Sequence, residues 1–290
     1  MAMSPLTTPP RLDTEVASRL ACPTCHAPLR IDGAVIRCMN DGCHFDGLIV
    51  DDVVVVGDRS TVSFFDDRHQ IMELGKACDG AWCLCYETQA TVVESVLRPG
   101  TAVLDVGCGP SLPYSKPDDC FVIGLEASFE SIRVNEALDM RVYGTAAALP
   151  LPAAAVDTIL CFYSLHHMTG QSVDENRATV QRVFNEFGRV LKPGGELLVF
   201  EVSPWRPTWI AERTLWNRAK RVIGGRLDMF FYPECEFESF GRRALPDATF
   251  SKQAFVRSML STFPPAFSLP WLQVPRFLYP FDVYLYRWRR

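Results

Sequence analysis

An apolar run that ends in Asp-x-Gly-x-Gly constrains this chain more than any other feature. Val103 to Val106 has the pattern of a buried strand, and Gly107 and Gly109 follow it directly. Glycine adopts backbone conformations closed to other residues and lets a ligand approach the main chain closely. The nicotinamide-binding pattern G-x-G-x-x-G would need a third glycine where this chain has Leu112. The run therefore predicts a strand that ends in a ligand-binding turn outside the dinucleotide fingerprint.

The segments around this turn alternate between strand and helix patterns. Apolar runs predict strands at residues 101–106, 120–125, 140–142, 157–163 and 196–202. Helical periodicity predicts helices at residues 87–97, 128–138 and 174–191. Such alternation is typical of an α/β fold, in which a doubly wound, mostly parallel sheet carries helices on both faces. The segment from Leu112 to Asp119 contains two prolines, so we expect the first crossover helix to be short or missing.

The alternation stops after Ser203. Residues 204–250 read as an insertion rich in Trp, Phe and Arg, which would cover the strand ends as a lid. We expect a helix from Ser251, whose hydroxyl can cap it, to Thr262. Residues 281–288 alternate in polarity and predict an edge strand.

Acidic, glycine-rich and histidine motifs follow the turn in a fixed order. Glu126 ends the second strand, 21 residues after Asp105, and a carboxylate there suits two ribose hydroxyls. Three segments come next: Gly144–Pro152, Ser164–Met168 and the Leu-Lys-Pro-Gly-Gly-Glu-Leu run at 191–197. Over about residues 85 to 203, this series resembles the class I methyltransferases that depend on S-adenosylmethionine (SAM). The resemblance implies a Rossmann-like, seven-stranded sheet and SAM as the cofactor.

The resemblance also implies which residues hold the cofactor. They lie at the ends of the strands and on the preceding helix: Tyr86, Asp105, Gly107, Cys108, Gly109, Glu126, Ala127, Thr145, Ala146 and Tyr163. Two departures point to retained but weaker binding. Thr145 stands where the family usually has an aspartate against the adenine amine, and Pro110-Ser111 replaces the usual end of the glycine turn.

His166 and His167 are the candidates for a catalytic base. Histidine titrates near neutrality, and the pair follows the fourth strand beside the expected cofactor site. The alternative is that the two rings shape the loop or bond a backbone group.

Four N-terminal cysteines have metal-ligand spacing. Cys22 and Cys25 form C-x2-C, and Cys38 and Cys43 form C-x4-C, which predicts a tetrahedral Zn²⁺ site. His44 is an alternative to Cys43 as a ligand. All four ligands come from the protein, so the site is expected to be structural. We therefore divide the chain into a zinc ribbon at 1–58 and a methyltransferase domain at 59–290, which contains the lid insertion.

The acceptor is expected to lie against the lid. Its aromatic and apolar residues predict a pocket for a small hydrophobic or aromatic molecule, such as a natural product or quinone. They are Trp205, Trp209, Trp216, Met229, Phe230, Phe231 and Tyr232. An ordinary packed lid helix explains the pattern around Trp209 and Trp216 as well as peripheral membrane contact does.

Charge and composition leave further readings open. Residues 205–290 carry 14 Lys and Arg against 7 Asp and Glu, whereas the rest carries 15 against 27. The basic third fits nucleic acid, an anionic membrane or an anionic substrate, but the acidic ribbon and core disfavour an RNA methyltransferase. A non-catalytic binding module is the third reading. Eleven cysteines, no secretory signal and no transmembrane run lead us to expect a cytoplasmic protein with reduced thiols.

Overall fold

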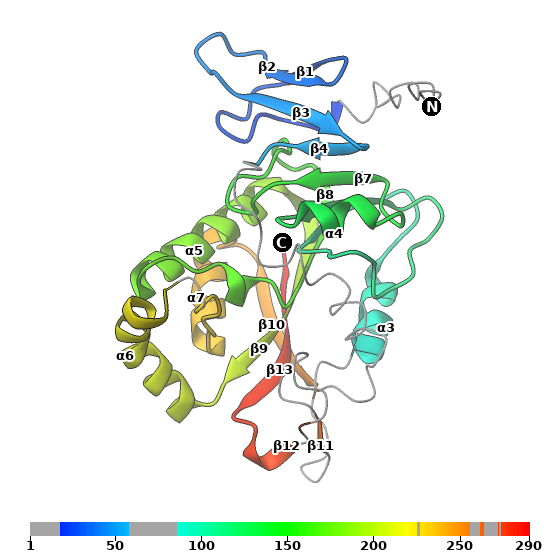
Figure 1. Cartoon of the computed structure of the whole chain (residues 1–290). Helices are drawn as coiled ribbons and strands as arrows, with labels where there is room; N and C mark the ends of the chain where they lie inside the picture. The colour runs from blue at the N-terminus through cyan, green and yellow to red at the C-terminus, as the bar shows by residue number, and fades with distance from the viewer. Residues whose placement is uncertain (1–17, 58–85, 225–226, 256–261, 264–271, 273) are drawn as a thin grey trace, which may run out of the picture.

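The computed structural model describes residues 18–57, 86–224, 227–255, 262–263, 272 and 274–290. Within them, eleven strands form one sheet in the order β1-β2-β3-β4-β7-β6-β5-β8-β9-β13-β10 (Figure 1). The strands are β1 (Leu29–Asp32), β2 (Val35–Cys38), β3 (Asp46–Val50), β4 (Val53–Val55), β5 (Ala102–Val106), β6 (Phe121–Glu126), β7 (Met140–Tyr143), β8 (Val156–Phe162), β9 (Leu191–Pro204), β10 (Thr249–Phe255) and β13 (Phe281–Arg289). A separate two-stranded sheet joins β11 (Thr262–Phe263) to β12 (Val274–Pro275).

The seven strands from β7 to β10 confirm the predicted doubly wound, mostly parallel sheet. Strands β7, β6, β5, β8 and β9 run parallel, and β13 runs antiparallel to both of its neighbours. Successive residues of the central strands enter different hydrophobic clusters, because side chains alternate between the two faces of a sheet. Helix α5 (Val173–Val190) packs in one cluster and α3 (Tyr86–Val96) in the other. Both faces of the sheet are therefore covered.

The segment between β5 and β6 confirms the effect of its two prolines. Residues 107–120 contain no helix, and the chain returns to the sheet through turns and bends. The next crossover holds α4 (Phe129–Val134), which begins at Ser128 because the Ser128 hydroxyl accepts a hydrogen bond from Ser131 N–H at 3.2 Å.

The C-terminal part of the sheet differs from the prediction. Residues 249–255, where a helix was expected from Ser251, form β10 and pair along their length with β13. Residues 256–261, the middle of that predicted helix, lie outside the described part of the chain. Because β10 occupies the edge, β13 lies between β9 and β10, and its prediction as an edge strand is wrong. A hydroxyl with cap potential is a local signal, and long-range strand pairing overrides it here.

The ribbon extends the same sheet. Strands β1 to β4 form an antiparallel meander, in which Gly33 (φ 61°) occupies the first central position of the β1–β2 turn. Strand β4 then pairs in parallel with β7, and its three valines are buried. The ribbon thus covers an edge that β7 would otherwise expose. The predicted domain boundary between residues 58 and 59 lies outside the described residues.

The insertion after β9 contains two helices, α6 (Arg206–Ile223) and α7 (Glu234–Ala244). Helix α7 packs against α5 and β13, and α6 lies further out beside α5 (Figure 1). The short helix η4 (Arg276–Leu278) precedes β13. Among the described residues, no helix is long and apolar enough to cross a membrane.

Candidate functional site

The glycine turn at the end of β5 approaches the end of β8 very closely. Gly107 has φ 69°, and a Cβ built on it would lie 1.9 Å from the Ser164 hydroxyl oxygen. Gly109 also has a left-handed φ of 63°. A side chain at Gly107 would therefore meet both backbone strain and a direct clash. At Gly107 and Gly109 the main chain is not shielded by side chains, and the turn lies at the carboxyl ends of the parallel strands, where such sheets bind ligands.

Asp105 lies fully buried at the base of this turn. The Tyr114 hydroxyl, from the loop that replaces the first crossover helix, donates to Asp105 Oδ2 at 2.8 Å. Burial and then the Asp105 charge raise the pKa of Tyr114 well above its usual value, so the phenol keeps its proton as a donor. Tyr114 could not be predicted from the sequence, because a tyrosine in an irregular loop has no recognisable spacing.

Glu126 faces the same turn from the end of β6. Its Oε2 accepts from Gly109 N–H at 3.0 Å, and its Oε1 accepts from Ala127 N–H at 2.7 Å and Ser128 N–H at 3.0 Å. Asn135 Nδ2 donates to the Gly109 carbonyl at 2.9 Å and ties α4 to the turn. Cys108, between the two glycines, is also buried. The structure thus brings Asp105, the glycine turn and Glu126 together, as the sequence predicted.

The loop after β7 carries the predicted adenine-side residues. Thr145 is exposed, and its hydroxyl accepts from Ala147 N–H at 3.3 Å, whereas Ala146 is buried. Thr145 therefore uses its acceptor within its own loop.

Tyr163 stands at the end of β8 in a strained conformation, with φ 50°. Its hydroxyl accepts a hydrogen bond from Gln89 Nε2, and Tyr86 contacts its ring edge-on at 5.5 Å between centroids. Both partners lie on α3, so the helix before β5 fixes the orientation of Tyr163. Non-glycine residues in left-handed conformations cluster at functional sites. Gln89, fully buried, escaped the sequence prediction.

His166 forms a buried pair with Glu201. The His166 Nδ1 lies 2.8 Å from Glu201 Oε2, and the same carboxylate accepts from Leu165 N–H at 2.8 Å and Val202 N–H at 3.2 Å. Glu201 has no exposed surface and His166 is 7% exposed. A carboxylate on Nδ1 orients the ring and stabilises a proton arriving at Nε2. A charged residue within the apolar run of β9 was the available signal for Glu201.

His167 has a different environment. Burial, and then the neighbouring His166, lower the pKa of His167 to about 2, although its ring also hydrogen-bonds the Asp228 backbone. A ring with that pKa stays neutral at physiological pH and is a weak base. The geometry therefore favours His166 over His167 as the proton acceptor.

Glu212 on α6 completes the surroundings of His166. Its Oε1 accepts from Phe231 N–H at 3.0 Å, and Phe231 stacks on the His166 ring at 5.0 Å between centroids. Burial raises the pKa of Glu212 to about 7. Its other oxygen, Oε2, is buried and has no hydrogen-bond partner among the described residues. The sequence offered no indication of Glu212, because its position depends on how the lid folds back.

The predicted aromatic pocket is only partly realised. Three of its members are packed in the core at 2% exposure or less, and contact one another edge to face: Trp216, Phe230 and Tyr232. Phe231 alternates to the other side, where it contacts Phe281 at 4.8 Å between centroids. Consecutive residues in extended backbone point in opposite directions, so one half of the aromatic run stabilises the lid and the other faces His166.

The four ribbon cysteines come together as predicted. Their Sγ atoms all lie within 4.8 Å of one another, with Cys22 to Cys43 at 3.7 Å and Cys25 to Cys38 at 3.3 Å. Tetrahedral Zn²⁺ with Zn–S bonds of about 2.3 Å separates sulfurs by about 3.8 Å, so the set fits that ion. Thr24 N–H and Asn40 N–H donate to the first and third thiols at 3.4 Å. Cys43, and not His44, belongs to the cluster.

The ribbon contacts the adenine-side loop at both of its ends. At one end, Val56 N–H donates to the Tyr143 carbonyl at 3.0 Å, and a Cβ on Gly144 would lie 2.8 Å from Val56 Cγ2. At the other end, Ala21 N–H, next to the first metal ligand, donates to the Pro150 carbonyl at 3.0 Å. The ribbon and the loop that carries Thr145 are therefore one packed unit.

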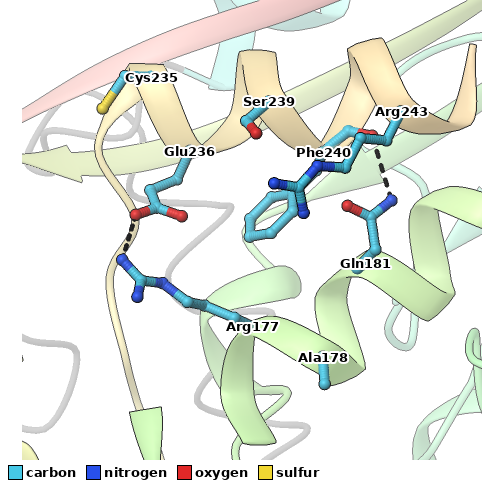
Figure 2. A pocket seen from close by; sticks show the side chains of 8 residues that line it. All are labelled: Arg177, Ala178, Gln181, Cys235, Glu236, Ser239, Phe240 and Arg243. Atoms are coloured by element: carbon cyan, nitrogen blue, oxygen red, sulfur yellow. Dashed lines mark hydrogen bonds and ion pairs between the residues drawn. The ribbon is translucent and has the colours of Figure 1, made fainter. Parts of the chain in front are cut away.

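A separate cavity of about 510 Å³ opens between α5 and α7 (Figure 2). An ion pair between Arg177 and Glu236 bounds one side, and Gln181 Nε2 donates to the Phe240 carbonyl at 3.3 Å on the other. None of the predicted cofactor or catalytic residues lines this cavity. It lies in the helical layer and not at the strand ends.

Comparisons with known proteins identify the kind of domain that contains these strand ends. Residues 104–199 match the family model of a methyltransferase domain. A Mycolicibacterium smegmatis protein, described as a probable S-adenosylmethionine-dependent methyltransferase, is 35% identical over 120 residues. That match covers 38% of this chain and 43% of the relative, so the chain spans less than half of the relative's length.

A solved structure shares the fold. A chain from the complex between the Haloferax volcanii Trm112 methyltransferase activator and a methyltransferase aligns with a TM-score of 0.51 and 16% identity, over 78% of this chain and 95% of that chain. A Thermotoga maritima SAM-dependent methyltransferase, titled a possible histamine N-methyltransferase, aligns with a TM-score of 0.49 and 18% identity, over 78% and 97%. Residues 104–199 are therefore those of a methyltransferase domain, and this part of the chain is similar to SAM-dependent methyltransferases.

Proposed function

We propose that this protein is an enzyme that transfers the methyl group of SAM to a small, hydrophobic or aromatic acceptor. One observation carries the proposal. The buried His166–Glu201 pair and the Phe231 ring lie at the same strand ends as the glycine turn and Glu126. A proton acceptor and an aromatic wall thus stand beside the predicted cofactor residues.

The predicted cofactor residues fit SAM. Gly107 and Gly109 bring the main chain to the strand ends without side chains, which suits the methionine half, and the Glu126 carboxylate suits the ribose hydroxyls. When bound, SAM supplies an electrophilic methyl group on a sulfonium, a good leaving group. The role of the protein is then mainly to align the acceptor and to remove its proton.

His166 is proposed to accept that proton at Nε2. As the acceptor takes the methyl group, the methyl–sulfur bond would break and S-adenosylhomocysteine would leave. The imidazole would take the acceptor's proton, and Glu201 on Nδ1 would stabilise the resulting imidazolium. His167 and Glu212 then shape the surroundings of His166.

The aromatic environment supports a hydrophobic or aromatic acceptor. Tyr86, Tyr163, Phe231 and Phe281 are partly buried side chains on the face of the sheet that α3 covers. Flat apolar walls with a few polar groups are typical of small-molecule sites. We propose that these four side chains line the acceptor site.

The ribbon is proposed to hold Zn²⁺ in a structural role. Because its four thiols fit the ion and its strands contact both ends of the adenine-side loop, bound metal would stabilise that loop.

Acceptor screening tests the proposal. Purified protein is incubated with SAM and sets of hydrophobic metabolites, and release of S-adenosylhomocysteine is measured with product mass spectrometry. Methylation of a hydrophobic or aromatic compound, reduced in His166→Ala, is the expected result. Ribosomal and transfer RNA enter the same assay, since the basic charge of residues 205–290 favours an anionic partner. Preferential RNA methylation would contradict the proposed acceptor, and SAM binding with no turnover on any set would favour a binding module.

A further inference from the structure

Helix α6 presents an uncovered surface that is both cationic and apolar. Of its residues, Trp216 and Lys220 are buried, and they fix which side faces the protein. The exposed arginines are Arg206, Arg213, Arg218 and Arg221. Ile210, Leu215 and Val222 are 47%, 56% and 87% exposed. We call the exposed arginines and apolar residues of 206–222 the α6 surface. Folding alone does not explain its exposed apolar side chains, because folding favours their burial against the core.

The charge of the α6 surface is unbalanced. Glu212 is the single acidic residue of the helix, and it turns inward to the Phe231 backbone. None of the four arginines forms an ion pair with any residue that the structure describes. Arg213 lies over the Trp209 ring at 4.8 Å, which leaves its charge available. Four guanidinium groups on one helix, without ion-pair partners among the described residues, make this surface attractive to an anionic partner.

The apolar surface continues from α6 onto η4. Trp205, the residue before α6, donates through Nε1 to Asp282 at 2.8 Å, and Arg276 pairs with the same carboxylate. This junction holds η4 beside the start of α6, with Phe277 and Leu278 at 50% and 62% exposure. Two elements far apart in sequence therefore meet at the start of α6, and each carries exposed apolar residues.

We propose that the α6 surface docks on an anionic lipid bilayer and that the methyl acceptor is drawn from that lipid phase. The proposal rests on the proposed function for its second half. Basic helices with exposed aliphatic residues lie in the membrane interface, with arginines at the phosphates and aliphatic side chains among the acyl chains. Nucleic acid would match the arginines but would leave Leu215, Val222 and Phe277 without apolar partners.

The α6 surface is also close to the predicted base. Glu212 on the inward side of α6 holds the Phe231 backbone, and Phe231 stacks on His166. Only these two contacts separate the helix from the imidazole. A hydrophobic acceptor leaving the bilayer beside α6 would therefore reach the site without crossing water.

Vesicle flotation with the full chain tests the docking. The vesicles contain phosphatidylcholine alone or with about a third phosphatidylglycerol, and total RNA is tested in parallel by filter retention. Variants are Arg218→Glu/Arg221→Glu, the milder Arg218→Gln/Arg221→Gln, and Leu215→Ser/Val222→Ser. Arg182→Glu/Arg243→Glu is the matched control, because both are exposed arginines outside the α6 surface. Thermal unfolding and SAM affinity are measured for every variant.

We expect binding to anionic vesicles at least about tenfold tighter than to neutral ones, because each arginine near an anionic leaflet adds to the attraction. Both charge variants should lose most of that preference, the Leu215/Val222 variant should bind several-fold more weakly, and the control should match the wild type. The proposal would be overturned if all variants floated equally or if the wild type did not float. It would also be overturned if the protein retained RNA through the arginines and without the aliphatic residues. Failure of SAM binding with intact flotation would instead contradict the proposed function alone.

Discussion

The cofactor side and the acceptor side of this molecule are positioned by different kinds of interaction. On the cofactor side, Gly109, Ala127 and Ser128 present backbone N–H groups to one buried carboxylate. On the acceptor side, side chains from remote elements determine the arrangement, as when Glu212 of α6 holds Phe231 over His166. Backbone geometry at strand ends depends on short motifs, whereas the lid depends on packing between elements distant in sequence. The cofactor side should therefore tolerate substitutions in the lid, whereas the acceptor side need not tolerate substitutions on the cofactor side.

The largest expected effect comes from the base. His166→Ala should lower kcat by about 10²- to 10⁴-fold, the usual contribution of a positioned acid–base group. SAM affinity should change by less than about threefold, because the ring contacts Glu201 and Phe231 and not the glycine turn. Steady-state kinetics and calorimetric titration measure the two quantities. His167→Ala is the matched control, and a larger kcat loss in that variant would transfer the base role to His167.

The second largest effect is expected on the cofactor side, from a substitution in the glycine turn. Gly107→Ala should weaken SAM binding by about 100-fold, because left-handed strain of roughly 1–3 kcal/mol adds to the clash with Ser164. Gly100→Ala provides the control, since Gly100 also has a positive φ of 75° but nothing within 4 Å of the added Cβ. Equal SAM affinity in the two variants would show that the turn does not hold the cofactor.

Loss of a ribbon ligand should act on the cofactor side through the adenine-side loop. Cys25→Ser should release the metal, lower the unfolding temperature and weaken SAM binding by about tenfold, or about 1.4 kcal/mol, because the adenine-side loop loses the ribbon that supports it. Metal analysis and titration measure both. Cys235→Ser, at an exposed cysteine of α7, should change neither. Wild-type SAM affinity in the metal-free protein would break the link between ribbon and loop.

The smallest effect concerns the lid carboxyl. The folded-state pKa of Glu212 is raised to about 7, so folding is penalised once the unfolded carboxyl ionises, and stability falls as pH rises from about 4.5 to about 7. Glu212→Gln removes this penalty and keeps an acceptor for Phe231 N–H. The variant should gain about 1 kcal/mol at pH 8 relative to pH 4, a value reduced for its partial exposure. Urea unfolding at both pH values measures it, and a gain at pH 4 alone would have the wrong sign.

The success of the sequence analysis follows the same division. Asp105, the glycine turn, Glu126 and the four cysteines were predictable because short spacings determine backbone turns and thiol clusters. The cap at Ser251 predicts a helix from Ser251 to Thr262, and only the pairing of residues 249–255 with β13 decides otherwise. Trp216, Phe230 and Tyr232 looked like pocket residues, but alternation along an extended backbone cannot tell which side faces the site. Glu212 and Tyr114 needed the tertiary structure itself.

The most direct test of a cofactor site at these strand ends is calorimetric titration of metal-analysed protein with SAM, and then with S-adenosylhomocysteine. We expect the wild type to bind SAM at one site per chain with micromolar affinity. His166→Ala should bind SAM with the same affinity, and Gly107→Ala should show no binding over the same concentration range. Absence of binding in the wild type, or undiminished binding in Gly107→Ala, would contradict a cofactor site at these strand ends.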